Sequence, residues 1–119
     1  MIDIDEEKLK IQWELLIQKL AEHFDEKPDL QVILFLIGVQ ELGKGYQKFS
    51  KEQKQDLMHI ATCKLLSQYG FYTFSGTDKD DWPQWKSVDK LPHFGILQQE
   101  KFLKQAVIKY FEEQQFIAY

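Results

Sequence analysis

The sequence predicts an all-α protein: a compact four-helix bundle that forms one domain over residues 1–119. Hydrophobic residues recur at helical spacing in each of the segments that we assign to its helices. One of these segments, residues 30–42, is apolar on nearly all sides, as expected for a central helix that the other helices enclose. A chain of 119 residues is also long enough to bury a single hydrophobic core.

The first helix is expected to run from about Asp5 to Phe24. Its core face follows helical spacing and consists of Leu9, Trp13, Leu16, Ile17, Leu20 and Phe24. A second, thinner apolar line lies on roughly the opposite side and consists of Ile4, Ile11 and Leu15. The outer face of a monomer needs no such line, so either the long loop described below or a partner chain is expected to cover it.

The second helix, Leu30–Leu42, is the central one and has the sequence LQVILFLIGVQEL. Asp29 is placed to cap its start, and Gly43 is placed to end it. The helix is too short to span a bilayer, which takes about 20 apolar residues. Gly38 in its middle lowers helix stability, which indicates that a neighbouring helix approaches closely at this position.

A capping-box pattern predicts the start of the third helix, with Ser50 at the cap and Gln53 three residues later. Gly70 is placed to end this helix in the left-handed conformation. Its core face is expected to contain Leu57, Met58, Ala61, Leu65 and Tyr69.

The fourth helix is expected to start between Pro92 and Ile96 and to run to about Phe116. Its apolar residues again recur at helical spacing, which predicts one face against the core. They are Ile96, Phe102, Leu103, Ala106, Val107, Tyr110 and Phe111.

A long loop, residues 71–92, separates the third and fourth helices and is rich in aromatic residues. Loops of this length usually have a function or contain a small structural element. Two alternatives are open: FYTF at 71–74 pairs with WKSV at 85–88 as a short hairpin, or Pro83 opens a single helical turn.

The aromatic residues of this loop have three alternative roles. They plug the open end of the core, form a protein-binding surface, or line a small-molecule site. Whether Trp82 and Trp85 pack inward or lie at the surface decides between these roles. With the second line of the first helix, the expected interaction surface is Ile4, Ile11, Leu15, Tyr72, Phe74, Trp82 and Trp85.

One row of polar residues on the third helix has the spacing of metal ligands. Glu52, Asp56, His59 and Cys63 follow one another at intervals of four, three and four residues, on the face away from the core stripe. His59 and Cys63 have the reach to share a divalent metal, but closed zinc sites usually need four ligands and no second such pair occurs. We therefore expect a solvated face with a half-buried Cys63, and no metal or cofactor.

Glu41 is a candidate acid or base because it follows the most apolar run of the chain. It lies in the last turn of its helix, where its side chain reaches water, and no histidine or second acid is placed near it by sequence. A structural role is expected. An alternative function, a metal- or small-molecule-binding protein or enzyme, would use Glu41, Asp56, His59 or Cys63.

The composition argues against several classes of partner and reaction. The net charge is -4 and all 15 basic residues are lysine, which disfavours nucleic acid and an anionic membrane as partners. The sequence has no Walker loop, GxGxxG or GxSxG motif. The acidic N-terminus lacks the features of a signal peptide and the single cysteine suits a reducing compartment, so we expect a cytoplasmic protein.

The run ILFLIGVQELGKG, followed by KEQKQDLMHIATCKLLSQYGFY and a Trp-Pro loop, resembles a group of small all-helical bacterial proteins of unknown function. The resemblance covers most of the chain and implies no activity or site residue. From the residues, the leading expectation is a non-enzymatic cytoplasmic helical domain that acts through protein–protein contacts, with a partner protein or as a homodimer.

Overall fold

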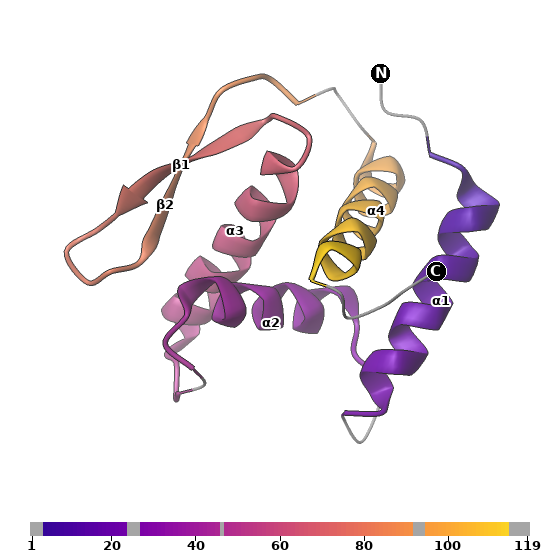
Figure 1. The fold of residues 1–119 in the computed structure, drawn as a ribbon, viewed down its shortest axis with the longest axis horizontal. Coiled ribbons are helices and arrows are strands. Elements are labelled where there is room, and N and C mark those ends of the chain that lie inside the picture. The colour runs from indigo at the N-terminus through magenta and orange to yellow at the C-terminus, as the bar shows by residue number, and fades with distance from the viewer. Residues whose placement is uncertain (1–3, 24–26, 46, 92–94, 115–119) are drawn as a thin grey trace. The chain divides into compact units, whose positions relative to one another are not determined.

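The computed structural model describes residues 4–23, 27–45, 47–91 and 95–114. Its elements, in chain order, are α1 (Glu6–Ala21), α2 (Leu30–Leu42), α3 (Lys51–Ser67), β1 (Tyr72–Thr77), β2 (Pro83–Ser87) and α4 (Ile96–Glu113) (Figure 1). They belong to two compact units: unit 1 holds α1 and α4, and unit 2 (Asp29–Leu91) holds α2, α3 and both strands. Within the described ranges, no helix combines the length and the apolar character needed to cross a membrane.

The prediction of an all-α helical bundle is wrong, because β1 and β2 pair as an antiparallel two-stranded sheet and make the fold mixed α/β. Of the two alternatives for the long loop, the hairpin is the one present. Pro83 is the first residue of β2, where its missing N–H is tolerated, and it opens no helical turn. Of the three helices expected to enclose α2, only α3 shares its unit.

The hairpin brings aromatic side chains from both strands together. Phe74 lies opposite Trp85, and Tyr72 lies opposite Ser87. The register shifts between Phe74 and Gly76, and Gly76 has a φ of 108°, which a residue with a side chain rarely adopts. The extra residue at this bulge belongs to β1, and the two strands are paired on both sides of the bulge.

Helix α2 packs against α3 at Gly38, as the sequence predicts. A Cβ added to Gly38 would lie 2.2 Å from the carbonyl oxygen of Leu57, so the two backbones are already in contact there. The predicted ends of α2 are also confirmed. The Asp29 carboxylate accepts a hydrogen bond from the Val32 N–H at 2.9 Å, and Gly43 ends the helix with a φ of 73°.

Helix α3 starts at the predicted capping box. The Gln53 N–H donates to the Ser50 hydroxyl at 3.1 Å, and the Ser50 N–H donates to the Gln53 side chain at 2.9 Å. Its buried face differs from the predicted stripe, because Met58 and Tyr69 are only partly buried and Ile60, Cys63 and Leu66 are buried as well. The buried residues are Leu57, Ile60, Ala61, Cys63, Leu65 and Leu66.

Unit 1 contains α1 and α4, whose contacts include Lys101 with Glu6 and Lys104 with Trp13. The Lys104 Nζ lies 5.2 Å from the centre of the Trp13 ring, within the range of a cation–π interaction. The buried residues are Leu9, Leu16, Ile17 and Leu20 of α1, and Phe102, Ala106, Val107, Ile108 and Tyr110 of α4.

Two details of the predicted helices in unit 1 differ from the structure or fall outside it. Ile96, expected in the core stripe of the fourth helix, is 86% exposed because it is the first residue of α4. Helix α4 starts at Ile96, within the range predicted for its start. Helix α1 ends at Ala21 and α4 at Glu113, and the predicted ends at Phe24 and Phe116 lie outside the described residues.

Candidate binding site

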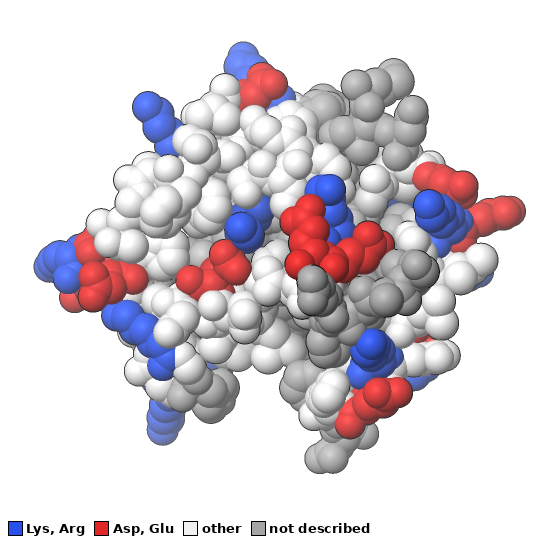
Figure 2. All heavy atoms as spheres, in the orientation of Figure 1, with Lys and Arg blue, Asp and Glu red and all other residues white. Residues whose placement is uncertain are grey.

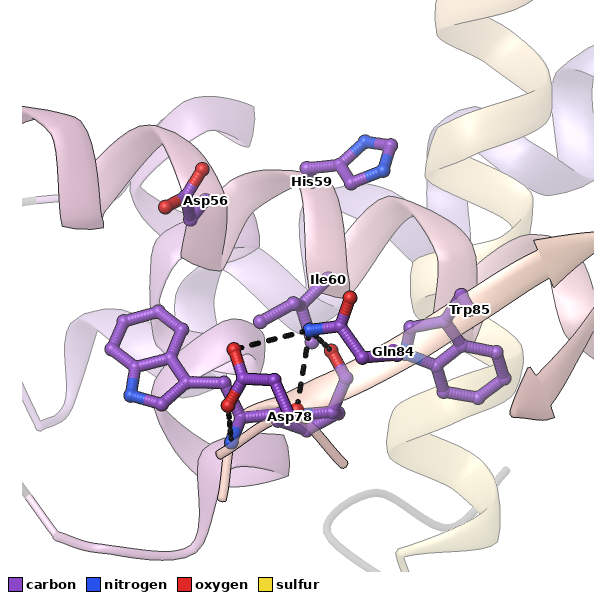
Figure 3. A pocket seen from close by; sticks show the side chains of 8 residues that line it. Asp56, His59, Ile60, Asp78, Gln84 and Trp85 are labelled. Atoms are coloured by element: carbon purple, nitrogen blue, oxygen red, sulfur yellow. Dashed lines mark hydrogen bonds between the residues drawn. The ribbon is translucent and has the colours of Figure 1, made fainter. Parts of the chain in front are cut away.

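A pocket of about 280 Å³ lies between α3 and the hairpin of unit 2 (Figure 3). Helix α3 contributes one wall, and the hairpin with its turn contributes the other. The lining residues are Asp56, His59 and Ile60 from α3, and Asp78, Trp82, Pro83, Gln84 and Trp85 from the hairpin. In Figure 3, Asp56 and His59 project from α3 across the pocket from Asp78.

Trp82 belongs to both the core and the pocket. Its ring meets Phe49 edge-on, with 6.4 Å between the ring centres, and Phe49 meets Phe35 in the same way at 6.0 Å. Phe49 is in turn buried in a cluster with Leu42, Leu57 and Ile60. Trp82 is therefore neither a simple plug nor a freely displayed side chain, since it is partly buried and lines the pocket at the same time.

Trp85 extends the aromatic surface along the hairpin. It pairs edge-on with Phe74 across the strands, with ring centres 5.7 Å apart, and Phe74 is 54% exposed. The Trp85 Nε1 atom is buried and has no hydrogen-bond acceptor among the described residues. The carbon faces of Trp85 and Phe74 thus form an aromatic pair next to the pocket that is only partly covered.

The Asp78 carboxylate holds the hairpin turn in place. Its Oδ1 atom accepts hydrogen bonds from the N–H groups of Asp80 and Trp82, both at 2.9 Å. Gln84 Nε2 donates to Asp78 Oδ2 at 3.5 Å and to the carbonyl oxygens of Trp82 and Pro83 (Figure 3). Asp78 is therefore a structural residue of the turn, and its bonds fix the backbone that carries Trp82.

The tip of the hairpin is not a purely acidic surface. Acidic and basic side chains lie side by side there, at the left of Figure 2. Lys44, in the segment after α2, donates from Nζ to the carbonyl oxygen of Asp80 at 2.5 Å. Asp81 has a φ of 64°, a conformation that aspartate tolerates better than most residues. The carboxylates at the tip thus belong to a tight turn tied to a neighbouring lysine.

The row of polar residues on α3 is divided by the structure. Asp56 and His59 are exposed and line the pocket, whereas Cys63 is only 1% exposed. The expectation of a half-buried Cys63 on the face away from the core is wrong, because the buried face of α3 extends round to include it. The Cys63 Sγ atom lies 3.5 Å from His59 Nε2. Within the described part of the chain, no group of three potential ligands is placed to hold a metal ion.

Burial raises the pKa of the Cys63 thiol from 9.0 to about 11, because the thiolate would lose its hydration. The unfolded chain therefore releases this proton near pH 9 and the folded chain near pH 11. The raised pKa of Cys63 therefore stabilises the folded state by its full amount below pH 9, and this stabilisation is lost as the pH rises through 11. A neutral, buried thiol is a poorer nucleophile than an exposed thiolate, which disfavours a nucleophilic role for Cys63.

The free energy of unfolding is expected to fall more steeply between pH 9 and 11 in the wild type than in Cys63→Ala. The difference in slope should reach about 1.4 kcal/mol per pH unit, which is the effect of one proton. Urea denaturation of both proteins across this range measures the difference in slope. The ionisation of lysines and tyrosines contributes equally to both slopes and cancels in the difference. Equal slopes would contradict the raised pKa.

Glu41 does not belong to the pocket. It is partly buried in the last turn of α2, and its carboxylate lies 4.0 Å from Lys64 Nζ of α3. Of the residues considered for the alternative function, Asp56 and His59 line the pocket, and Cys63 contacts His59 without lining it.

The predicted interaction surface is divided between the two units. On α1, Ile11 is 62% and Leu15 is 49% exposed, whereas Ile4 is partly buried. Trp82 and Trp85 line the pocket of unit 2, with Phe74 and Tyr72 on the neighbouring strand. The pocket also contains Ile60, Asp78, Pro83 and Gln84, which the sequence did not single out as members of one site.

Comparisons of this chain with protein-family models, with curated proteins and with solved structures find no match. Several of the candidate residues meet at the pocket of unit 2.

Proposed function

We propose that the protein is a cytoplasmic binding module that recognises a segment of another protein with the surface around the pocket of unit 2. The observation that carries this proposal is the position of Trp82 and Trp85, which are partly buried and line one pocket beside the exposed Phe74. Aromatic residues, tryptophan above all, contribute most of the binding energy at many protein interfaces. The single cysteine, which is unpaired, suits the reducing environment of the cytoplasm.

The hydrogen bonds of the hairpin turn also favour binding. Because Asp78 and Gln84 hold the backbone around Trp82, the aromatic wall is already formed before a partner arrives. A preformed surface loses less conformational entropy on binding than a flexible loop does. Phe49 adds to this order because its ring supports Trp82 from the core side.

Photo-crosslinking of the full chain in cells of its source organism tests the proposal. The photoreactive residue p-benzoylphenylalanine replaces Phe74, which is exposed on the hairpin, or Val32, which is 44% exposed on α2 and does not line the pocket. We expect a crosslinked protein from position 74 and none from position 32. We also expect the crosslink to be lost on Trp85→Ala in a protein whose circular dichroism is unchanged.

Two results would overturn the proposal. One is the absence of a crosslink from position 74, and the other is a crosslink that Trp85→Ala leaves in place. If Trp85→Ala lowers the helical content, Asp56→Lys serves instead, because Asp56 is exposed and lies in the pocket wall without supporting the core, and a long basic side chain there obstructs the pocket.

Self-association through α1 is a second candidate function. The exposure of Ile11 and Leu15, one turn apart on the same helix, favours it because such a line is unusual on the outer face of a monomer. Sedimentation velocity of the wild type at high micromolar concentration tests this candidate. A dimer that Ile11→Lys dissociates is expected, and a monomer throughout the concentration range contradicts it.

A further inference from the structure

The pocket between α3 and the hairpin has a marked charge preference. Two carboxylates, Asp56 and Asp78, lie in its walls, and among the described lining residues there is no lysine and one basic side chain, that of His59. This is notable in a chain with 15 lysines. An anionic group entering the pocket would be repelled by both carboxylates, whereas a cation would be attracted.

The two carboxylates are not equally available. Asp78 already accepts hydrogen bonds from the N–H groups of the turn and from Gln84. Its main contribution to the pocket is therefore its negative charge, and not a direct hydrogen bond to a ligand. Asp56 is exposed, and its carboxylate makes no hydrogen bond or ion pair with any residue in the described ranges. Asp56 is thus the group of the pocket that can form a direct ion pair with a ligand.

The other walls suit a cation with an aliphatic stem. Tryptophan has the most favourable aromatic face for a cation, and the pocket has Trp82 and Trp85 in its lining. Ile60 and Pro83 add apolar surface against which methylene groups can pack. The chain already uses this chemistry in unit 1, where the Lys104 ammonium lies over the ring of Trp13.

The volume limits the size of the ligand. Pockets for drug-sized ligands start at about 300 Å³, so one of about 280 Å³ suits a single long side chain better than a cofactor. A metal ion is a poorer candidate, because the structure places no group of three ligands together among the residues it describes.

We infer that the pocket binds one positively charged side chain, a lysine or an arginine, from the partner segment. Asp56 forms the ion pair, and Trp82 and Trp85 contact the aliphatic stem and the charged group. This inference rests on the proposed function, since it specifies the chemistry of the partner at the same surface.

NMR of the full-length protein tests this inference through the indole N–H signals of its tryptophans. The probe is the peptide acetyl-Gly-Arg-Gly-amide, and the matched control is the same peptide with citrulline, which has the shape of arginine without its charge. We expect the arginine peptide to shift the signals of Trp82 and Trp85 saturably, with a millimolar dissociation constant that weakens as salt is added. The signal of Trp13, which is already covered by Lys104, should not move.

Two variants identify the carboxylate responsible. Asp56→Asn is expected to weaken binding of the arginine peptide about threefold, the size typical of a partly exposed ion pair. Glu52→Gln is the matched control, because Glu52 is exposed one turn earlier on α3 and is not part of the lining. It should leave the affinity unchanged.

The outcomes separate this inference from the proposed function. Equal binding of the arginine and citrulline peptides, or no saturable shift with either, overturns the cation site, while a crosslink from Phe74 would still support a protein partner. A saturable response to arginine without any crosslink supports the cation site and overturns the protein partner in favour of a free small cation.

Discussion

Replacing Phe49 with alanine is expected to lower the free energy of unfolding by about 4 kcal/mol, the usual cost of removing a buried phenylalanine ring. Phe49 is 6% exposed and lies in the cluster with Leu42, Leu57 and Ile60. Its ring also contacts Trp82 edge-on, so the variant loses aromatic contacts in addition to buried area. The cavity left behind lies directly under the aromatic wall of the pocket.

Urea denaturation measures the loss of stability, and the indole N–H signal of Trp82 reports the change at the pocket. Phe74→Ala is the matched control, because the same ring is removed from a position that is 54% exposed. We expect the control to lose less than about 1 kcal/mol, as for most surface substitutions. Similar losses in the two variants would show that Phe49 is not a core residue.

Replacing Gly38 with alanine is expected to destabilise the protein by about 3 kcal/mol, the upper range for overpacking a core. The added Cβ would lie 2.2 Å from the carbonyl oxygen of Leu57 and 2.9 Å from its Cβ. Two packed backbones cannot yield as the end of a flexible side chain can, so α2 and α3 must move apart. Leu57, which is 0% exposed, would lose contacts in the process.

The sign of this effect makes the test decisive. Helix propensity alone predicts the opposite result, a gain of about 1 kcal/mol on replacing glycine with alanine inside a helix. Gln40→Ala on the exposed side of α2 is the control and should change stability by less than about 0.5 kcal/mol. A stabilised or unchanged Gly38→Ala would contradict the close packing of α2 on α3.

The helix ends of unit 2 could be predicted because their signals are local. Asp29, Gly43 and the Ser50–Gln53 pair each act on backbone groups within a few residues. Gly38 was informative for a similar reason, since glycine inside an apolar helix has few explanations other than a close neighbour. Which element approaches Gly38 depends on tertiary packing, and the sequence pattern did not distinguish α3 from the other helices.

The hairpin could be named only as an alternative, because its deciding interactions depend on the folded turn. The Asp78 side chain accepts two backbone N–H groups of its own turn, an interaction that exists only once the turn has formed. Phe74 and Trp85 then lie opposite one another and contribute a cross-strand aromatic contact. Neither interaction has a sequence signature that excludes the competing helical turn at Pro83.

The members of the candidate site were partly predictable, but their grouping was not. Trp82 and Trp85 stood out by residue type, and Asp56 and His59 stood out by spacing. The spacing also suggested that Cys63 belongs with Asp56 and His59. The structure buries Cys63 and places Asp56 and His59 in the pocket beside the hairpin. The sequence pattern could not show this grouping, because the packing of the hairpin on α3 joins segments that are distant in sequence.

The hairpin supplies most of the pocket from one short stretch of chain. Five of its eight lining residues lie between Asp78 and Trp85, and the rest come from little more than one turn of α3. Evolution can therefore alter the ligand preference by exchanging a few neighbouring codons, without touching the contact of α2 with α3. Protein engineers could likewise change this one short stretch, by grafting a small library of variant turns onto the scaffold and selecting new binding specificities from it.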